Sequence, residues 1–175
     1  MENYKSANRL TTYTEGQVLV MERSLKAPRE LVFKAFSEKE HLANWWGPQG
    51  WQTKTLKFEF KPNGEWHYCM KCIDEKQGHF FDQESFGKAI YQEIVVPEKI
   101  VYTDLFVDAE GNPIDGMPEI LVTMTFTEKE GETNLIVQSK FASIESLQQV
   151  MNMGIVQGFA SQFDRLDHLL EVLNN

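Results

Sequence analysis

The 175-residue sequence has little of several features that would define a function class directly. It contains two cysteines, and a chain of this length needs no disulfide framework to fold. No apolar run approaches the roughly 20 residues of a membrane-spanning helix, and residues 1–16 lack the apolar stretch of a signal peptide. These absences argue against a membrane partner, and we expect a cytoplasmic protein.

Positive charge is also scarce, because 17 Lys and Arg face 26 Asp and Glu and leave a net charge of -9. A field of this sign repels phosphate backbones and anionic lipid heads, so nucleic acid and membrane surfaces are not expected as partners. The sequence has no glycine-rich phosphate loop and no nucleophile elbow. We therefore predict no catalytic residue and no cofactor.

The two cysteines form a Cys69-x-x-Cys72 pair, which with His67 and His79 would supply the ligand types of a zinc site. In a strand, however, His67 and Cys69 lie on one face and Cys72 on the other. A redox pair of this spacing normally begins a helix beside a βαβ unit, which is not the pattern here. Ordinary strand cysteines are predicted, with no metal.

Aromatic residues, by contrast, make up 12% of the chain, and the apolar pattern changes its period along the sequence. Residues 17–25 alternate as a strand, and two short helical stripes follow up to Gly47-Pro48. From Trp51 to Phe141 the period is two, with turn residues at short intervals, which predicts an antiparallel meander. Residues 144–173 carry one sustained helical stripe.

This order predicts an α+β fold in which a curved antiparallel sheet of about six to seven strands wraps around a long C-terminal helix. Two short helices follow strand one. The long helix is the only predicted element large enough to cover one face of the sheet. Residues 1–15 show no clean period and are expected to be a flexible tail, so residues 16–175 form the single domain.

Several short motifs resemble a known family in their order and spacing. Arg23 with Ala27-Pro28 resembles the opening of the SRPBCC superfamily, which includes the START and birch-pollen-allergen folds. Trp45-Trp46-Gly47-Pro48, Pro62-Asn63-Gly64 and Gly158-Phe159 resemble one branch, the homologues of the activator of the heat-shock protein 90 ATPase. The similarity runs from about residue 17 to 173. It implies a helix-grip fold with a hydrophobic cavity, and it implies no particular ligand or reaction.

The expected cavity lies between the sheet and the C-terminal helix. Gly154 and Gly158 are four residues apart within the predicted helix, where each costs about 1 kcal/mol relative to Ala. Close packing or room for a ligand would offset that cost, and plain core packing stays open as the alternative. The predicted ligand-binding residues are Arg23, Trp46, Trp51, Trp66, Tyr68, Met70, Tyr91, Phe106, Met124, Phe126, Met151, Gly154, Gly158 and Phe159.

Few polar side chains are predicted inside the cavity. Arg23 and Tyr68 share alternating positions with apolar neighbours, and an inward Arg23 requires a carboxylate partner or a ligand anion. A structural ion pair is the favoured interpretation for it. Asp104 is interpreted as solvated surface charge. Trp45, Trp46 and Trp51 cluster in a Gly/Pro loop, where they would gate the pocket mouth. The favoured interpretation is that at least one of them is a core anchor and the others form a loop clasp.

Three function classes follow. The first is binding of a small hydrophobic molecule by a monomer or weak homodimer, which the pocket favours. The second is stimulation of a chaperone ATPase, as the family resemblance implies, with a chaperone as partner. The third is an enzyme of the polyketide cyclase or aromatase kind, for which Tyr68, Asp104 and Arg23 are the residues to replace.

Overall fold

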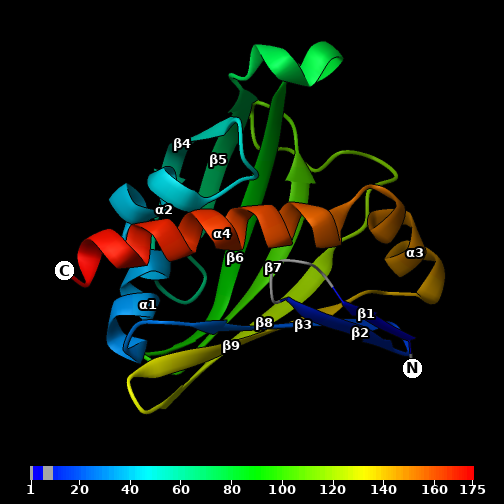
Figure 1. The fold of residues 1–175 in the computed structure, drawn as a ribbon. Helices are drawn as coiled ribbons and strands as arrows, with labels where there is room; N and C mark the ends of the chain where they lie inside the picture. The colour runs from blue at the N-terminus through cyan, green and yellow to red at the C-terminus, as the bar shows by residue number, and fades with distance from the viewer. Residues whose placement is uncertain (1, 6–9) are drawn as a thin grey trace.

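The computed structural model describes residues 2–5 and 10–175, and its strands form one antiparallel sheet (Figure 1). In space the strands follow the order β1-β2-β3-β9-β8-β7-β6-β5-β4. The strands are β1 (Glu2–Lys5), β2 (Thr11–Glu15), β3 (Val18–Leu25), β4 (Trp51–Phe58), β5 (Glu65–Cys72), β6 (Glu84–Val95), β7 (Lys99–Val107), β8 (Ile120–Lys129) and β9 (Glu132–Lys140). Among the strands of the described residues, only β3 and β9 are neighbours in the sheet that lie far apart in the sequence.

The sheet has more strands than the six to seven predicted, because the N-terminal segment extends it. Within the tail predicted over residues 1–15, residues 2–5 and 11–15 form β1 and β2, and residues 1 and 6–9 lie outside the described residues. Strand β2 pairs antiparallel with β3, and Thr12 faces Met21 across the pair. Thr12 is 1% exposed, so this threonine-rich strand packs on the core.

The helices are α1 (Arg29–Ser37), α2 (Lys39–Trp45), the short 3-10 helix η1 (Glu75–Phe80), α3 (Ile144–Asn152) and α4 (Ile155–Leu173). The single long helix predicted over residues 144–173 is therefore two helices. The helix is interrupted at Met153-Gly154, where Gly154 has φ +89° and precedes the first turn of α4. A side chain strains this left-handed conformation, which explains glycine at this position.

Helix α4 crosses the concave face of the sheet, with α1 and α2 beside its C-terminal half and α3 beyond its N-terminus (Figure 1). The expected helix-grip arrangement is thus present. Phe163, Leu166 and Leu170 of α4 are at most 2% exposed. On the sheet side, the Phe126 ring meets Phe36 edge-to-face at 5.2 Å. Burying one such side chain contributes about 1.5 to 3 kcal/mol, so this layer supplies much of the fold's stability.

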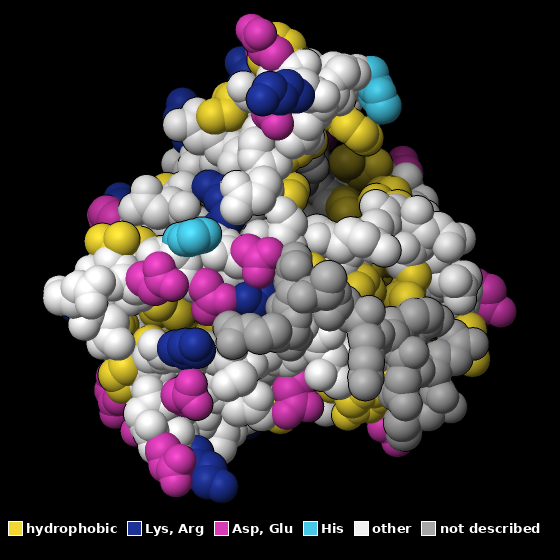
Figure 2. Space-filling model, viewed as in Figure 1, with side chains coloured by type: hydrophobic (Ala, Val, Ile, Leu, Met, Phe, Trp, Pro, Cys, Tyr) yellow, Lys and Arg dark blue, Asp and Glu magenta, His cyan; other side chains and the backbone are white. Residues whose placement is uncertain are grey.

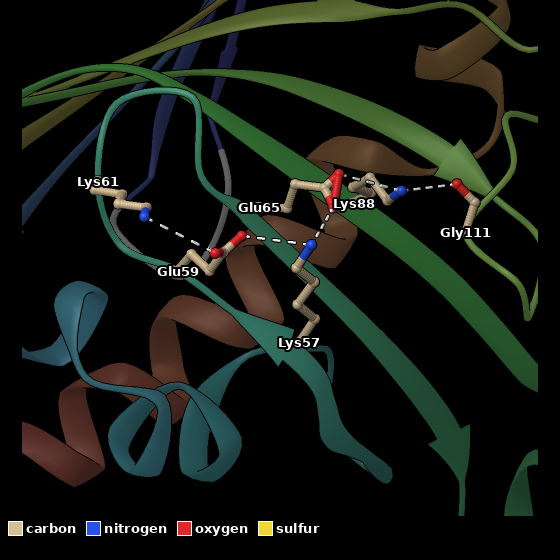
Figure 3. A network of polar contacts seen from close by, with 6 residues as sticks. All are labelled: Lys57, Glu59, Lys61, Glu65, Lys88 and Gly111. Carbon is tan, nitrogen blue, oxygen red and sulfur yellow. Dashed lines mark hydrogen bonds and ion pairs between the residues drawn. The ribbon is translucent and has the colours of Figure 1, made fainter.

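A row of ion pairs lies on the polar side of β4, β5 and β6 (Figure 3). Lys57 Nζ lies 3.2 Å from a Glu65 carboxylate oxygen and 3.4 Å from Glu59, and Lys61 completes the row at 4.0 Å from Glu59. Hydrogen bonding to Lys57 lowers the pKa of Glu65. Lys88 contacts Glu65 at 3.5 Å and donates to the Gly111 carbonyl at 2.8 Å. Exposed pairs of this kind contribute little to stability, but Lys88 ties the β7–β8 loop to the sheet.

Candidate functional site

A pocket of about 210 Å³ opens between the sheet and the connection from α3 to α4. Figure 2 shows a hollow floored by hydrophobic side chains beside this connection. Its walls come from the loop after α2, from β5, β7 and β8, and from both C-terminal helices. The lining residues are Trp46, Pro48, Tyr68, Met70, Asp104, Phe106, Ile120, Val150, Met153, Gly154, Ile155, Gly158, Phe159 and Gln162.

Trp46 forms the wall at the α2 end of the pocket, and α4 holds it in place. Arg165 Nη1 donates to the Trp46 carbonyl at 3.2 Å and to the Gly47 carbonyl at 2.9 Å. The Gly47 amide in turn donates to Gln162 Oε1 at 3.0 Å, and Thr53 Oγ1 donates to the Trp46 carbonyl at 2.7 Å. Because side chains satisfy these loop groups, the loop can lie against the core without losing hydrogen bonds.

Tyr68 lies beside Trp46, with 5.9 Å between the ring centroids. The position of the Tyr68 ring requires that the residue paired with it on β6 has no side chain. Its partner across the β5–β6 pair is Gly87. A Cβ atom on Gly87 would lie 2.4 Å from Tyr68 Oη and 2.5 Å from Cζ. Glycine therefore gives the Tyr68 ring room to lie over the sheet and face the pocket.

Asp104 is the one acidic side chain in the lining, and it is half-buried. Burial raises the pKa of its carboxyl from 3.8 to about 7, and a hydrogen bond from the Leu105 backbone opposes the rise only in part. Burial also raises the pKa of Tyr68, and the nearby Asp104 charge adds to this effect. At neutral pH the pocket thus holds a carboxyl that can gain or lose a proton, beside a neutral phenol.

The structure brings half of the predicted ligand-binding residues to the pocket. The seven residues that line it are Trp46, Tyr68, Met70, Phe106, Gly154, Gly158 and Phe159. They come from the loop after α2, from β5, from β7 and from the N-terminal part of α4 with its cap. A Cβ atom added to Gly158 would meet nothing within 4 Å, so this glycine borders open space.

Three other predicted residues line a smaller, separate void. Trp66, Tyr91 and Met124 surround a space of about 20 Å³ with Trp46, deeper between the sheet and the short helices. Phe126 is 1% exposed and belongs to the packed core. These inward positions lie too far along the strands to reach the larger pocket, and the period of a strand alone does not reveal that.

The remaining three predicted residues lie elsewhere. Arg23 is buried below α4, where its guanidinium pairs with Asp167 and, at 3.0 Å, with Asp164. This is the structural ion pair that the sequence favoured. Trp51 lies outside the pocket, where its indole donates to Gln77. Met151 faces the core from α3 without reaching the pocket.

Asp104 and Gln162 are the polar lining residues that sequence reasoning missed. Asp104 was expected on the solvated surface, yet it alternates with Ile100, Tyr102 and Phe106 on the inner face of β7. This alternation with apolar residues indicates an inward position for Asp104. The prediction of a surface position followed the acidic residue type instead. Gln162 lies on α4 in a polar stretch of the helix, and the hydrogen bond that it accepts from the Gly47 amide joins segments that no local pattern connects.

The Cys-x-x-Cys pair lies outside the pocket. Both thiols are free and buried, and Cys69 Sγ lies 3.3 Å from a Glu84 carboxylate oxygen. Burial raises the pKa of the Cys69 thiol to about 11, so it stays protonated. Across residues 2–5 and 10–175, no group of three His, Cys, Asp or Glu side chains is arranged to hold a metal ion. In the same described residues, no helix is long and apolar enough to cross a membrane.

Comparison with known proteins agrees with this fold. Residues 26–171 match the family model described as Activator of Hsp90 ATPase homolog 1-like protein. This chain belongs to that family. The match includes α1, α2, strands β4 to β9, α3 and nearly all of α4. The elements that enclose the pocket all lie within it. The resemblance read from the tryptophan loop and the Gly158-Phe159 pair is confirmed.

Solved structures show the same fold over nearly the whole chain of this Activator of Hsp90 ATPase homolog 1-like family member. A protein from Mycobacterium smegmatis has 25% identity and a TM-score of 0.82, with 92% of this chain and 96% of that chain covered. One from Staphylococcus epidermidis has 25% identity and a TM-score of 0.77, with 91% and 93% covered. An AHSA1 protein from Silicibacter pomeroyi has 20% identity and a TM-score of 0.67, with 89% and 98% covered. No curated protein matches the chain.

Proposed function

We propose that this protein binds a small hydrophobic or aromatic molecule in the pocket between the sheet and helices α3 and α4. The observation that carries the proposal is the open space of about 210 Å³ walled mainly by apolar side chains. Ligand sites for drug-sized molecules measure about 300 to 1,000 Å³, so this pocket suits a molecule of one or two rings. The family fold supports the same interpretation.

The glycine in the pocket wall provides a direct test. Gly158→Phe adds a ring where an added Cβ meets open space, so the side chain can enter the pocket without displacing the backbone. A matched control is Val172→Phe, because Val172 lies on the same helix, is 72% exposed and is remote from the pocket. Both variants carry a new aromatic ring on α4.

The measurement is native mass spectrometry and calorimetry with a panel of one-ring and two-ring apolar compounds. Binding with one molecule per chain is expected for the wild type and for Val172→Phe, and it is lost in Gly158→Phe. Equal binding by all three proteins would place the ligand elsewhere. If no compound binds the wild type, the proposal fails.

The family description favours a second candidate, stimulation of a chaperone ATPase. Such an activity needs a docking surface for the chaperone, and the pocket does not supply one. The test is the ATP hydrolysis rate of an Hsp90 chaperone with and without this protein. A saturable rise that survives Gly158→Phe would support this second role, and an unchanged rate would remove it.

A further inference from the structure

The pocket contains one group that can carry a negative charge and no group that carries a positive one. Asp104 is the acid among the lining residues, and the lining includes no Lys, Arg or His. Among residues 10–175, no cation pairs with the Asp104 carboxylate. A carboxylate in apolar surroundings is costly unless a cation compensates it. The pocket therefore has an electrostatic preference as well as a shape.

Aromatic rings surround the same space. Trp46 lies 5.9 Å from Tyr68 and 6.3 Å from Phe159, measured between ring centroids, and Phe106 completes the aromatic lining. The faces of such rings attract cations, and organic ammonium groups are bound in this way among several rings. A carboxylate beside them strengthens the attraction, because both act on the same charge.

The charge of the whole protein acts in the same direction. A net charge of -9 raises the local concentration of cations and lowers that of anions. A fatty acid or another carboxylate would meet Asp104 at close range and suffer like-charge repulsion. A neutral apolar molecule would fill the space but leave the Asp104 carboxylate uncompensated. Of the three ligand charges, the positive one fits best.

We propose that the pocket recognises an organic ammonium ion, with its apolar body among Met70, Phe106 and Phe159 and its charged nitrogen beside Asp104. This inference rests on the proposed function, since it assumes that the pocket binds a small molecule, and it adds the charge of that molecule. The cation balances the charge of the half-buried Asp104 carboxylate, and the aromatic rings replace part of the water that the cation loses on binding.

Three probes of similar size separate the charge from the shape. Benzyltrimethylammonium carries a permanent positive charge, neopentylbenzene replaces its nitrogen by carbon, and 4-phenylbutanoate carries a negative charge. Calorimetry at pH 8 should give an affinity for the ammonium probe that is at least about tenfold above the affinity for neopentylbenzene. The anion should bind weakest. Asp104→Asn should abolish the preference, so that the ammonium probe binds no more tightly than neopentylbenzene.

The pH dependence gives an independent readout. The titratable groups that interact with Asp104 are Tyr68 and Tyr102, and both phenols stay neutral up to pH 8 because burial raises their pKa values. The helices contribute only uncharged residues to the lining. Protonation of Asp104 below its pKa of about 7 removes the charge that attracts the cation. Affinity for benzyltrimethylammonium should therefore be about tenfold lower at pH 6 than at pH 8, and level with pH in Asp104→Asn.

The outcomes test the preference for a cation separately from the proposed binding of a ligand in the pocket. If neopentylbenzene or 4-phenylbutanoate binds as tightly as the ammonium probe, the inference is overturned while binding in the pocket stands. If Asp104→Asn keeps the preference for the cation, Asp104 is not its partner and the inference is overturned. If none of the probes binds, both proposals fail. A thermal melt of Asp104→Asn confirms that any lost affinity does not reflect unfolding.

Discussion

Replacing Asp104 by Asn should make the protein more stable at neutral and alkaline pH. In the unfolded chain the carboxyl has its ordinary pKa of 3.8, and in the folded protein the pKa is about 7. Between these values the unfolded chain has lost a proton that the folded protein keeps. Stability therefore falls as pH rises from about 4 to about 7, and it stays level above that. Asparagine cannot ionise, so Asp104→Asn escapes this loss.

The pKa difference of about three corresponds to about 4 kcal/mol, since each pKa unit is worth about 1.4 kcal/mol. The stabilisation of Asp104→Asn should reach this size at pH 8 and fall to about 2 kcal/mol at pH 5. Urea unfolding followed by tryptophan fluorescence at several pH values measures it. Glu119→Gln, at an exposed position, is the control and should change stability little.

A less stable Asp104→Asn, or a stability difference that does not change with pH, would refute the burial argument for this carboxyl. The expected gain agrees with a binding role for Asp104, because residues that serve a binding site can lower the stability of the folded protein. A bound cation would lower the Asp104 pKa and restore the stability that the carboxylate costs.

Three further predictions concern the supporting structure. Gly158→Ala should stabilise the protein by about 0.5 to 1 kcal/mol in thermal melts through helix propensity, whereas Gly154→Ala should destabilise it because φ there is +89°; equal effects would contradict the helix break. Joint replacement of Asp164 and Asp167 by Asn should lower the free energy of unfolding by about 3 to 5 kcal/mol in urea, because Arg23 loses these two carboxylates. A change below about 1 kcal/mol would contradict a stabilising role for these ion pairs. Gly87→Ala should displace Tyr68 and weaken ligand binding at least about tenfold, and unchanged affinity would exclude Tyr68 from the site.

The alternating pattern predicted the inward faces of the central strands well. Ile120, Val122, Met124 and Phe126 are all buried, since period two and burial coincide where strands are regular. The same rule fails at Leu56, which is 44% exposed. A bulge in β4 between Thr55 and Lys57 shifts the register there. The residue types in this segment do not indicate where the extra residue of the bulge lies.

Features that depend on distant contacts were harder to predict. The apolar stripe continues across the break at Gly154, so the pattern alone favours one helix over residues 144–173. How far each inward residue lies along its strand also decides whether it reaches the pocket, as Met70 does and Trp66 does not. That distance follows from the bend of the sheet and from the position of α4, which are properties of the assembled fold.

The central claim is that the space beneath α3 and α4 receives a ligand, and a nitrogen-15 NMR titration tests it most directly. Addition of benzyltrimethylammonium should shift the amide signals of Gly154 and Gly158 and the indole signal of Trp46 together, with one saturation curve. The signals of η1, which projects away from the pocket, should not move (Figure 1). Shifts confined to η1, or unchanged glycine signals at saturating concentrations of all three probes, would contradict the account.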